Sequence, residues 1–443
     1  MPMNKQKWID RALELGLESF EIYQSLTSER SVTWYEGKLD TFTTSKVLGT
    51  SIRGVYQKKM ANMAFEKIED DQMDAVLQAL IEQAKTISSK EEDKIRTPQP
   101  FESVHKPTKW VVPDVEQVKE VLKQLESKLK AYDPRILQVN ELGYQEASGK
   151  RMITNSLGLD VEDEERMQII MAYVVAGENN DVQVNYEVEV VEDLSTLDLD
   201  VFVKKVCDKA IEKLNASSMP SQTLPVIFET EAMTSLFSAF TGLWNGELLY
   251  KGISCLKDKW NEKIFSEKIT IEDDPRNVEA LTIANFDDEG CPTRKKVLVK
   301  DGVFVQALHS TKSASCMQTE STGNGFKSGY ASTIGVSPMN CCIVPGEKSL
   351  QQLEETMKDG LVITDLQGLH AGIDFVTTNF SLQASGYLVK DGKRDRSVTL
   401  ITVAGNFMDL MKKVEEVGSD LDWSYHQIKS PSIYFKECAV SGE

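Results

Sequence analysis

The four histidines of the chain show whether it can hold a catalytic zinc ion on a helix. They are His105, His309, His370 and His426, and no two of them lie within one helical turn. A zinc-hydrolase helix needs two histidines about one turn apart, with a glutamate beside them as the general base. The sequence therefore excludes a helical zinc motif, and it leaves open only a metal site assembled from distant residues.

The seven cysteines offer a second chemistry, in which a thiol paired with a histidine attacks a substrate. They are scattered and include no Cys-x-x-Cys pair, which is typical of reduced thiols in the cytosol rather than of a disulfide framework. Cys341 and Cys342 lie in an apolar run typical of a buried strand, where cysteine behaves as a small hydrophobic residue. We favour a core role for them and keep a thiol hydrolase as the alternative.

Two glycine-flanked polar residues are candidates for contact with a substrate. Asn324 lies between Gly323 and Gly325, and His370 lies two residues before Gly372. Each offers side-chain hydrogen bonds beside backbone that no bulky neighbour covers. Each segment is equally compatible with a simple tight turn. No Gly-x-Ser-x-Gly elbow, P-loop or dinucleotide fingerprint is present.

Two runs of carboxylates, 272–274 and 287–289, could in principle hold a hard cation. Such a site needs several oxygens that converge on one point. Adjacent acidic residues in a strand point to alternate sides, and both runs precede turns. We therefore interpret both runs as solvated turn residues.

The elements that would position these residues follow from the spacing of apolar side chains. The first half of the chain reads twice as a set of strands followed by a helix, which leaves open a diverged duplication. Turn signals occur at 155–158 and 177–180, and the proline-rich segment 88–113 is typical of a linker. We expect strands at 20–26, 31–35, 39–44, 48–56, 62–65 and within 136–191, and helices near 8–13, 73–84, 115–129 and 199–214.

A small, polar, proline-containing segment at 217–221 is the best domain boundary. We expect an α+β protein with two domains, 1–216 and 222–443. The first would hold helix-flanked strand meanders, and the second a mostly antiparallel sheet with a few helices. In the second domain, the apolar stripe of residues 233–244 predicts a helix that follows a short strand at 224–228.

Composition limits the partners and the compartment. The formal net charge is -19 and no basic run of five residues occurs, which argues against direct binding of nucleic acid. No stretch is long and apolar enough to cross a membrane. The N-terminus runs straight into an amphipathic helix pattern without a secretory signal. We therefore expect a cytoplasmic protein.

Six short strings follow one another in the C-terminal half: Ser321–Gly325, Gly368–Gly372, Phe380–Tyr387, Thr402–Phe407, Val417–Leu421 and Ser430–Ser432. Taken in this order, they resemble the TldD/PmbA family (named as modulators of DNA gyrase), and within it the TldE (PmbA) branch. The turn Thr154–Gly158 also fits this resemblance, which covers nearly the whole chain.

This resemblance implies a two-domain α+β subunit of a heterodimeric metalloprotease that degrades unfolded proteins and trims peptide precursors. The TldD branch carries a His-Glu-x-x-x-His zinc helix and a late cysteine ligand. In this chain Phe237, Ser238 and Gly242 stand at the three motif positions, and the cysteine region falls near Lys429, with no thiol. The resemblance thus implies a degenerate metal helix, no metal and no catalytic residue in this chain, and zinc only in a TldD-type partner.

The leading hypothesis from the sequence is a non-catalytic subunit that completes the substrate chamber of a TldD-type partner. It would bind extended peptides, with Asn324 and His370 as contacts, and it could form a homodimer in isolation. Two alternatives remain: a stand-alone peptidase that uses a thiol, and a binding protein that modulates DNA gyrase indirectly.

Overall fold

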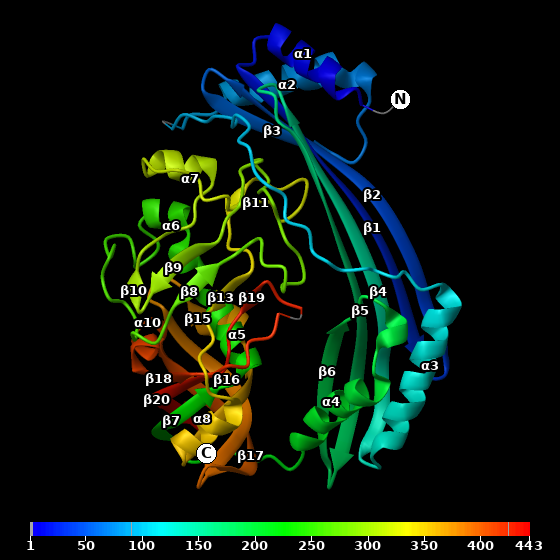
Figure 1. The fold of residues 1–443 in the computed structure, drawn as a ribbon, viewed down its shortest axis with the longest axis vertical. Coiled ribbons are helices and arrows are strands. Elements are labelled where there is room, and N and C mark those ends of the chain that lie inside the picture. The colour runs from blue at the N-terminus through cyan, green and yellow to red at the C-terminus, as the bar shows by residue number, and fades with distance from the viewer. Residues whose placement is uncertain (1–2, 90, 424) are drawn as a thin grey trace.

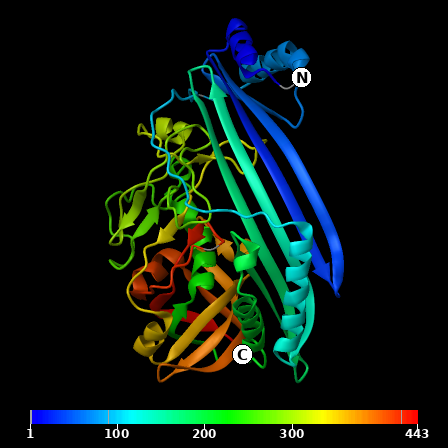
Figure 2. The same cartoon turned by 45° about the vertical axis from the view of Figure 1, so that its right-hand side comes forward.

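The computed structural model describes residues 3–89, 91–423 and 425–443. A long, twisted sheet built from the first half of the chain lies beside a compact C-terminal part (Figure 1). The two parts are joined by the segment that follows residue 212, and the long sheet extends beyond the C-terminal part at one end (Figure 2). The α+β class expected from the sequence is confirmed.

The long sheet has six strands in the order β3-β2-β1-β4-β5-β6, all antiparallel. Each half of it is a unit of helix, three strands and helix, and the two units meet at the β1/β4 pair. This arrangement is the one that a duplication would produce. The bounds are α1 Lys5–Glu14, β1 Ser19–Tyr35, β2 Lys38–Tyr56, β3 Lys59–Phe65, η1 Asp70–Gln72, α2 Met73–Lys85, α3 Val115–Tyr132, β4 Ile136–Asn155, β5 Asp160–Glu178, β6 Asp181–Val190, η2 Leu194–Thr196 and α4 Leu199–Glu212.

The expected strands at 20–26 and 31–35 are one continuous strand, β1, and those at 39–44 and 48–56 are likewise one strand, β2. The prediction of breaks was wrong because the polar residues between these runs interrupt the alternation of apolar side chains but not the ladder. β1 pairs with β2 on one side and β4 on the other through residues 27–30. Arg30 also donates to Glu146 and to the carbonyl of Pro113. Tertiary pairing here outweighs local pattern.

The tight turns expected from the sequence are confirmed. Asn179 and Asn180 connect β5 to β6 with positive φ of 51° and 69°, the backbone that a two-residue hairpin turn requires. In the turn that precedes β5, the Asn155 side chain accepts from the N–H groups of Leu157 and Leu159. Gly158 then has φ +92°, a conformation that glycine adopts at no steric cost.

Each helix pair buries its apolar stripe mainly against its own three strands, and α3 also packs on Val32 and Trp34 of β1. In α3 the stripe comprises Val118, Leu122, Leu125 and Leu129, and all four are fully buried. Full burial of such a side chain stabilises the fold by about 1.5–3 kcal/mol. Asp114 begins the helix with a capping box, because its side chain accepts from the Gln117 N–H while the Gln117 side chain accepts from the Asp114 N–H.

The C-terminal part holds a seven-stranded, mostly antiparallel sheet, a five-stranded sheet and a two-stranded ribbon. The seven-stranded sheet contains β7 Gln222–Phe228, β14 Gly360–Gln367, β15 Ile373–Asp374, β16 Asn379–Lys390, β17 Lys393–Asn406, β18 Val414–Val417 and β20 Ile433–Ser441. The five-stranded sheet contains β8 Ile271–Asp273, β9 Lys296–Lys300, β10 Val303–Phe304, β13 Cys341–Ile343 and β19 Ile428–Lys429, and the ribbon pairs β11 Gly325–Phe326 with β12 Gly335–Val336.

The helices of the C-terminal part are short and surround these sheets. They are α5 Thr230–Phe240, η3 Thr241–Trp244, α6 Gly246–Tyr250, α7 Thr311–Cys316, α8 Leu350–Met357, α9 Leu369–Gly372, α10 Phe407–Leu410 and η4 Met411–Lys413. Among the residues described, no helix combines the length and the apolar character needed to cross a membrane. We retain the division near residues 217–221 as a proposal.

Candidate functional site

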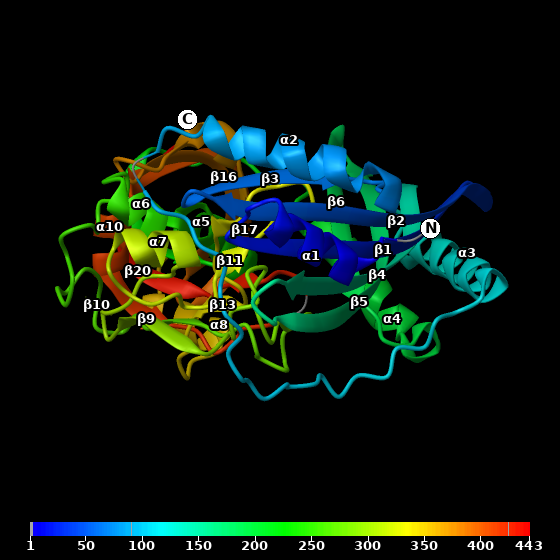
Figure 3. The ribbon, with the colours of Figure 1, turned by 90° about the horizontal axis from the view of Figure 1, so that it is seen from above.

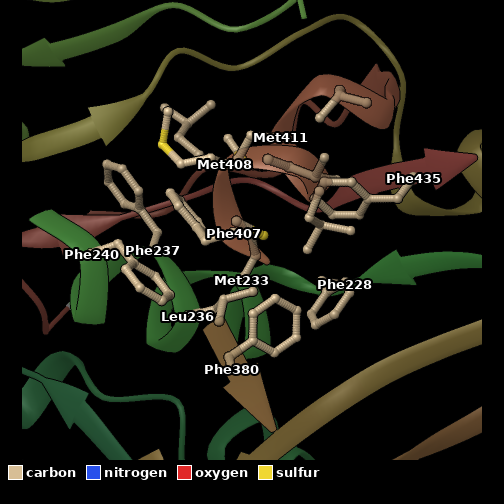
Figure 4. Packing of buried hydrophobic residues seen from close by; sticks show 14 of the residues in the cluster. Phe228, Met233, Leu236, Phe237, Phe240, Phe380, Phe407, Met408, Met411 and Phe435 are labelled. Atoms are coloured by element: carbon tan, nitrogen blue, oxygen red, sulfur yellow. The ribbon is translucent and has the colours of Figure 1, made fainter. Parts of the chain in front are cut away.

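Helix α5 and the turn η3 that follows it carry the three positions that the resemblance marks as a degenerate metal helix: Phe237 and Ser238 lie in α5, and Gly242 lies in η3. Phe237 and Phe240 point into the main core of the C-terminal part and are fully buried (Figure 4). The Phe237 ring centroid lies 5.9 Å from that of Trp244, and the Phe240 ring stacks on Phe407 at 4.4 Å. Rings in such offset and tilted pairs add packing energy beyond their buried area. Both phenylalanines are therefore structural residues here.

The other two positions do not offer metal ligands either. Ser238 is half-buried and lies two residues before the end of α5. A Cβ built on Gly242 would lie 2.9 Å from the Phe375 ring, so the ring covers the place where a side chain at this position would extend. The residues present do not fit a zinc ion, which needs three or four nitrogen, sulfur or oxygen ligands at about 2.0–2.3 Å.

The start of α5 holds an unusual carboxylate. Glu229 is the N-cap residue, yet its side chain makes no capping hydrogen bond. Burial raises the pKa of Glu229 to about 7, and nearby Lys209 only partly offsets this effect. Glu229 is therefore partly protonated near neutral pH.

The prediction that both acidic runs are solvated was wrong for most of their members. Asp273, Asp287, Asp288 and Glu289 are all at most 4% exposed, whereas Glu272 and Asp274 are half-buried. Each of the four buried carboxylates has a cationic or backbone partner, which compensates for the cost of its desolvation. Within residues 3–89, 91–423 and 425–443, no three histidine, cysteine, aspartate or glutamate residues are grouped so that they could hold a metal ion.

Asn324 lies at the centre of one buried polar network. Its amide Nδ2 donates to Asp273 at 3.0 Å and to the Ser337 carbonyl at 3.0 Å, and its Oδ1 accepts from Lys296 at 2.8 Å. Lys296 also lies 2.9 Å from Asp273, and both are almost completely buried. The Asn324 side chain thus holds β8, β9 and the ribbon together.

The glycines on either side of Asn324 are also enclosed. A Cβ on Gly323 would lie 2.6 Å from the Pro292 carbonyl, and one on Gly325 would lie 2.6 Å from Glu289 Oε2. The expected exposed backbone is therefore absent at residues 323–325. The substrate-binding role assigned to them from the sequence remains a prediction without geometric support.

His370 lies elsewhere, on the surface of the one-turn helix α9. Gly372 ends this helix, and a side chain there would overlap the Ser381 carbonyl. Helix α9 packs beside α5. Among the described residues, no printed interaction joins His370 to the Asn324 network, so the structure does not bring the two predicted contacts together.

The large hollow of the molecule lies between the long sheet and the C-terminal part. Two adjoining cavities of about 480 and 680 Å³ share a wall formed by 148–150 on β4 and 163–166 on β5. Residues 282–283 line both from the opposite side. We call this space the interdomain groove. Sequence reasoning missed it because its lining comes from segments more than 100 residues apart.

Buried ion pairs cross the groove and fix the two parts together. The Arg151 guanidinium on β4 donates to Asp288 Oδ1 at 2.8 Å and to the Phe286 carbonyl at 2.8 Å. It also lies over the Phe286 ring, 4.7 Å from the centroid. Charge-assisted bonds of this kind are stronger than neutral ones.

A second crossing is made by Arg53 of β2, which donates to Glu21 at 2.7 Å and lies 3.6 Å from Glu289. Next to Glu289, Asp287 is fully buried, and burial raises its pKa to about 7 although its carboxylate accepts three backbone N–H bonds. Lys327 Nζ donates to Ser51 at 2.6 Å, and burial lowers the pKa of Lys327 to about 8.

None of the seven cysteines is a strong candidate nucleophile. Burial raises the pKa of Cys291 to about 11 and of Cys342 to about 12. Burial also raises the pKa of Cys341. A cysteine nucleophile needs a lowered pKa, because the thiolate is the reactive form.

The long sheet with its paired helices, which lies across a groove from an α+β part that begins with β7 and α5, defines a protein of the PmbA/TldD class. Three sequence models of the PmbA/TldA metallopeptidase match in order: domain 1 over residues 20–88, the central domain over 110–214 and the C-terminal domain over 221–442. The chain belongs to the PmbA/TldD family.

Named relatives agree with this assignment. The metalloprotease PmbA of Escherichia coli O157:H7 is 27% identical over 312 residues, which are 70% of this chain and 66% of that protein. A metalloprotease of Methanocaldococcus jannaschii is 25% identical over 436 residues, which are 95% of this chain and 94% of that one.

Solved structures show the same fold. A Thermotoga maritima protein, which bears the provisional name of a DNA gyrase modulator, superposes with a TM-score of 0.87 at 27% identity and covers 99% of both chains. TldE of Thermococcus kodakarensis superposes with a TM-score of 0.87 at 24% identity, covering 99% of this chain and 100% of that one.

Proposed function

We propose that this chain is a non-catalytic, TldE-like subunit that works with a TldD-type zinc metalloprotease on unfolded proteins or peptide precursors in the cytoplasm. The observation that carries the proposal is the packing at α5. Phe237 is buried in the core, and Phe375 covers Gly242. A zinc ion and its activated water have no place on such a helix.

The interdomain groove supports a role in handling polypeptide. It is long enough to include two cavities of about 480 and 680 Å³, and its walls mix cations and anions. Such a surface accommodates polypeptide without demanding one sequence. A subunit of this kind would enclose substrate while its partner supplies the reaction.

The free edge of the long sheet supports association with a related chain. β3 pairs with β2 only over Thr50–Tyr56, so residues 38–49 present unpaired backbone groups along one edge. Phe42 and Val47 are exposed on this segment. Such an edge is a template for another strand. If the same segment of a related chain paired with it in antiparallel fashion about residue 43, Asp40 of each strand would face the residue equivalent to Lys46 of the other.

The experiment that tests the proposal mixes the purified chain with a TldD-type subunit carrying the His-Glu-x-x-x-His helix, using casein as substrate. We expect cleavage only by the mixture, and loss of cleavage when zinc is chelated or when the partner's motif glutamate is changed to glutamine. Cleavage by this chain alone in the presence of a chelator contradicts the proposal.

The two competing hypotheses give different results in the same preparation. A thiol peptidase would be active alone and would lose activity when one cysteine is changed to serine, although the raised pKa of these thiols argues against it. A gyrase-directed binding protein would co-purify with gyrase in the absence of any TldD-type chain.

A further inference from the structure

Residues 101–110, which connect the two helix–strand units of the long sheet, cross the outside of the interdomain groove as an extended chain. We call them the strap. In Figure 3 the strap is part of the cyan trace that runs as an extended chain along the lower edge of the molecule. All ten residues are described, and none belongs to a helix or strand. Within this segment no backbone group is hydrogen-bonded to another backbone group.

One side chain of the C-terminal part holds the strap by its backbone. The Val104 N–H donates to Asn285 Oδ1 at 2.7 Å, and Asn285 Nδ2 donates to the Val104 carbonyl at 3.1 Å. Asn285 is only 5% exposed. A carboxamide offers one donor and one acceptor side by side, so it satisfies both backbone groups of a single residue. This contact recognises extended backbone and not the identity of the side chain.

A second contact holds the strap by its backbone, because Arg276 donates to the Glu102 carbonyl. Two contacts use strap side chains: Lys106 Nζ donates to the Leu281 carbonyl at 3.2 Å, and the Phe101 ring lies 5.7 Å from Phe286. Burial alternates along the strap: Val104, Lys106, Thr108 and Trp110 are half-buried and line the cavity of about 680 Å³, whereas the residues between them are exposed, although exposed His105 also lines this cavity.

An extended segment bound through its backbone, with alternate side chains turned into a cavity, is how proteins hold peptide ligands. We propose that Asn285 and the adjoining groove form a binding site for an extended polypeptide, and that the strap occupies this site in the free chain as an internal competitor. The inference rests on the proposed function for the class of ligand. The cavity beneath the strap gives an incoming segment the space to enter before the strap is displaced.

A substitution in the strap can weaken its contact with Asn285 without changing Asn285 or the groove. Val104→Pro removes the N–H that Asn285 accepts, and proline suits an extended chain. Val104→Ala is the matched control, because it keeps that N–H. The probe is a fluorescent, end-capped decapeptide with the sequence of residues 101–110, and binding to the full-length chain is measured by fluorescence anisotropy without any partner or zinc.

We expect Val104→Pro to bind the probe about tenfold more tightly than the wild type, since one competing hydrogen bond is lost. Val104→Ala should bind like the wild type, and adding Asn285→Ala to Val104→Pro should abolish the gain. A probe methylated on its valine nitrogen should bind about tenfold more weakly to Val104→Pro. Equal binding by the proline and alanine variants would overturn the proposal.

A second measurement does not depend on any variant. Trypsin can cut the exposed bond after Lys109, while the bond after Lys106 precedes proline. Saturating probe should displace the strap and accelerate cleavage after Lys109 in the wild-type chain, and an unchanged rate also overturns the proposal. Both measurements use this chain alone, so their failure leaves the subunit role intact, and failure of the casein experiment leaves this site intact.

Discussion

The guanidinium group of Arg151, on strand β4, lies 2.8 Å from the carboxylate of Asp288, in the C-terminal part; the Asp288 side chain is buried and that of Arg151 is 19% exposed. The pair joins residues that are 137 positions apart in the chain. It is one of several charged contacts that hold the long sheet against the C-terminal part, and so it maintains the groove between them.

Replacing Arg151 should weaken the fold substantially. Arg151→Met leaves the buried Asp288 carboxylate without its cation, and removal of one partner of a buried pair costs about 3–5 kcal/mol. Asp288 keeps a bond from the Lys327 N–H, so we expect a value near the lower end. Urea unfolding followed by circular dichroism measures it. Lys150→Met is the control: Lys150 pairs with Glu162 and Glu164 at the surface, and its loss should cost less than about 1 kcal/mol.

Glu229 should make stability depend on pH. Its folded pKa of about 7 lies above the ordinary value of 4.5, so the stability contributed by its neutral form is complete below pH 4.5 and is lost as the pH rises through 7. Glu229→Gln should therefore stabilise the protein at pH 8, by at most about 3 kcal/mol, with a gain that shrinks towards pH 5. Urea midpoints at the two pH values test this. Glu231→Gln, an exposed change on the same helix, should show no such difference.

Gly49 should not tolerate a side chain. A Cβ at this position would overlap the Tyr330 ring, which reaches across from the C-terminal part to β2. Gly49→Ala should destabilise the chain by about 1–3 kcal/mol, the usual effect of overpacking, as measured by the thermal unfolding midpoint. Gly329→Ala is matched, because nothing lies within 4 Å of its Cβ position. Equal midpoints for the two variants would refute the contact.

The free edge of β2 should govern association. Phe42 is 46% exposed on this edge. Phe42→Asp should reduce assembly with a TldD-type chain, or self-association if the chain is studied alone. The free energy of unfolding should stay within about 0.5 kcal/mol of the wild-type value. Sedimentation velocity measures the assembly. Val376→Asp, at an exposed site in the C-terminal part, should leave assembly unchanged.

The sequence predicted those features that depend on residues within a single helix or turn. The helix faces of α2, α3 and α4 follow from apolar spacing, because each helix packs on strands from its own half of the chain. The Asn179–Asn180 hairpin follows from residues that tolerate positive φ. The apolar stripe of residues 233–244 likewise predicted the helix α5, and the structure places its Phe237 and Phe240 in the core.

Three other features depended on distant partners. The length of β1 is set by β2 and β4 pairing on its two sides, not by its own alternation. Asp287 and Asp288 are buried because Arg151 and the backbone N–H groups of Gly325 and Lys327 reach them from elsewhere in the chain. Asn324 is a structural residue for the same reason.

The sequence by itself determined the class of fold, the family and the absence of a metal-binding helix, because these depend on residue types at short spacing. Only the tertiary structure decided which charges are buried, where the groove lies and that Asn285 holds the strap at Val104. The physical reason is that desolvation and hydrogen bonding act between groups that are close in space, and the groups that fix the groove and the strap, Arg151 with Asp288 and Val104 with Asn285, lie far apart in the chain.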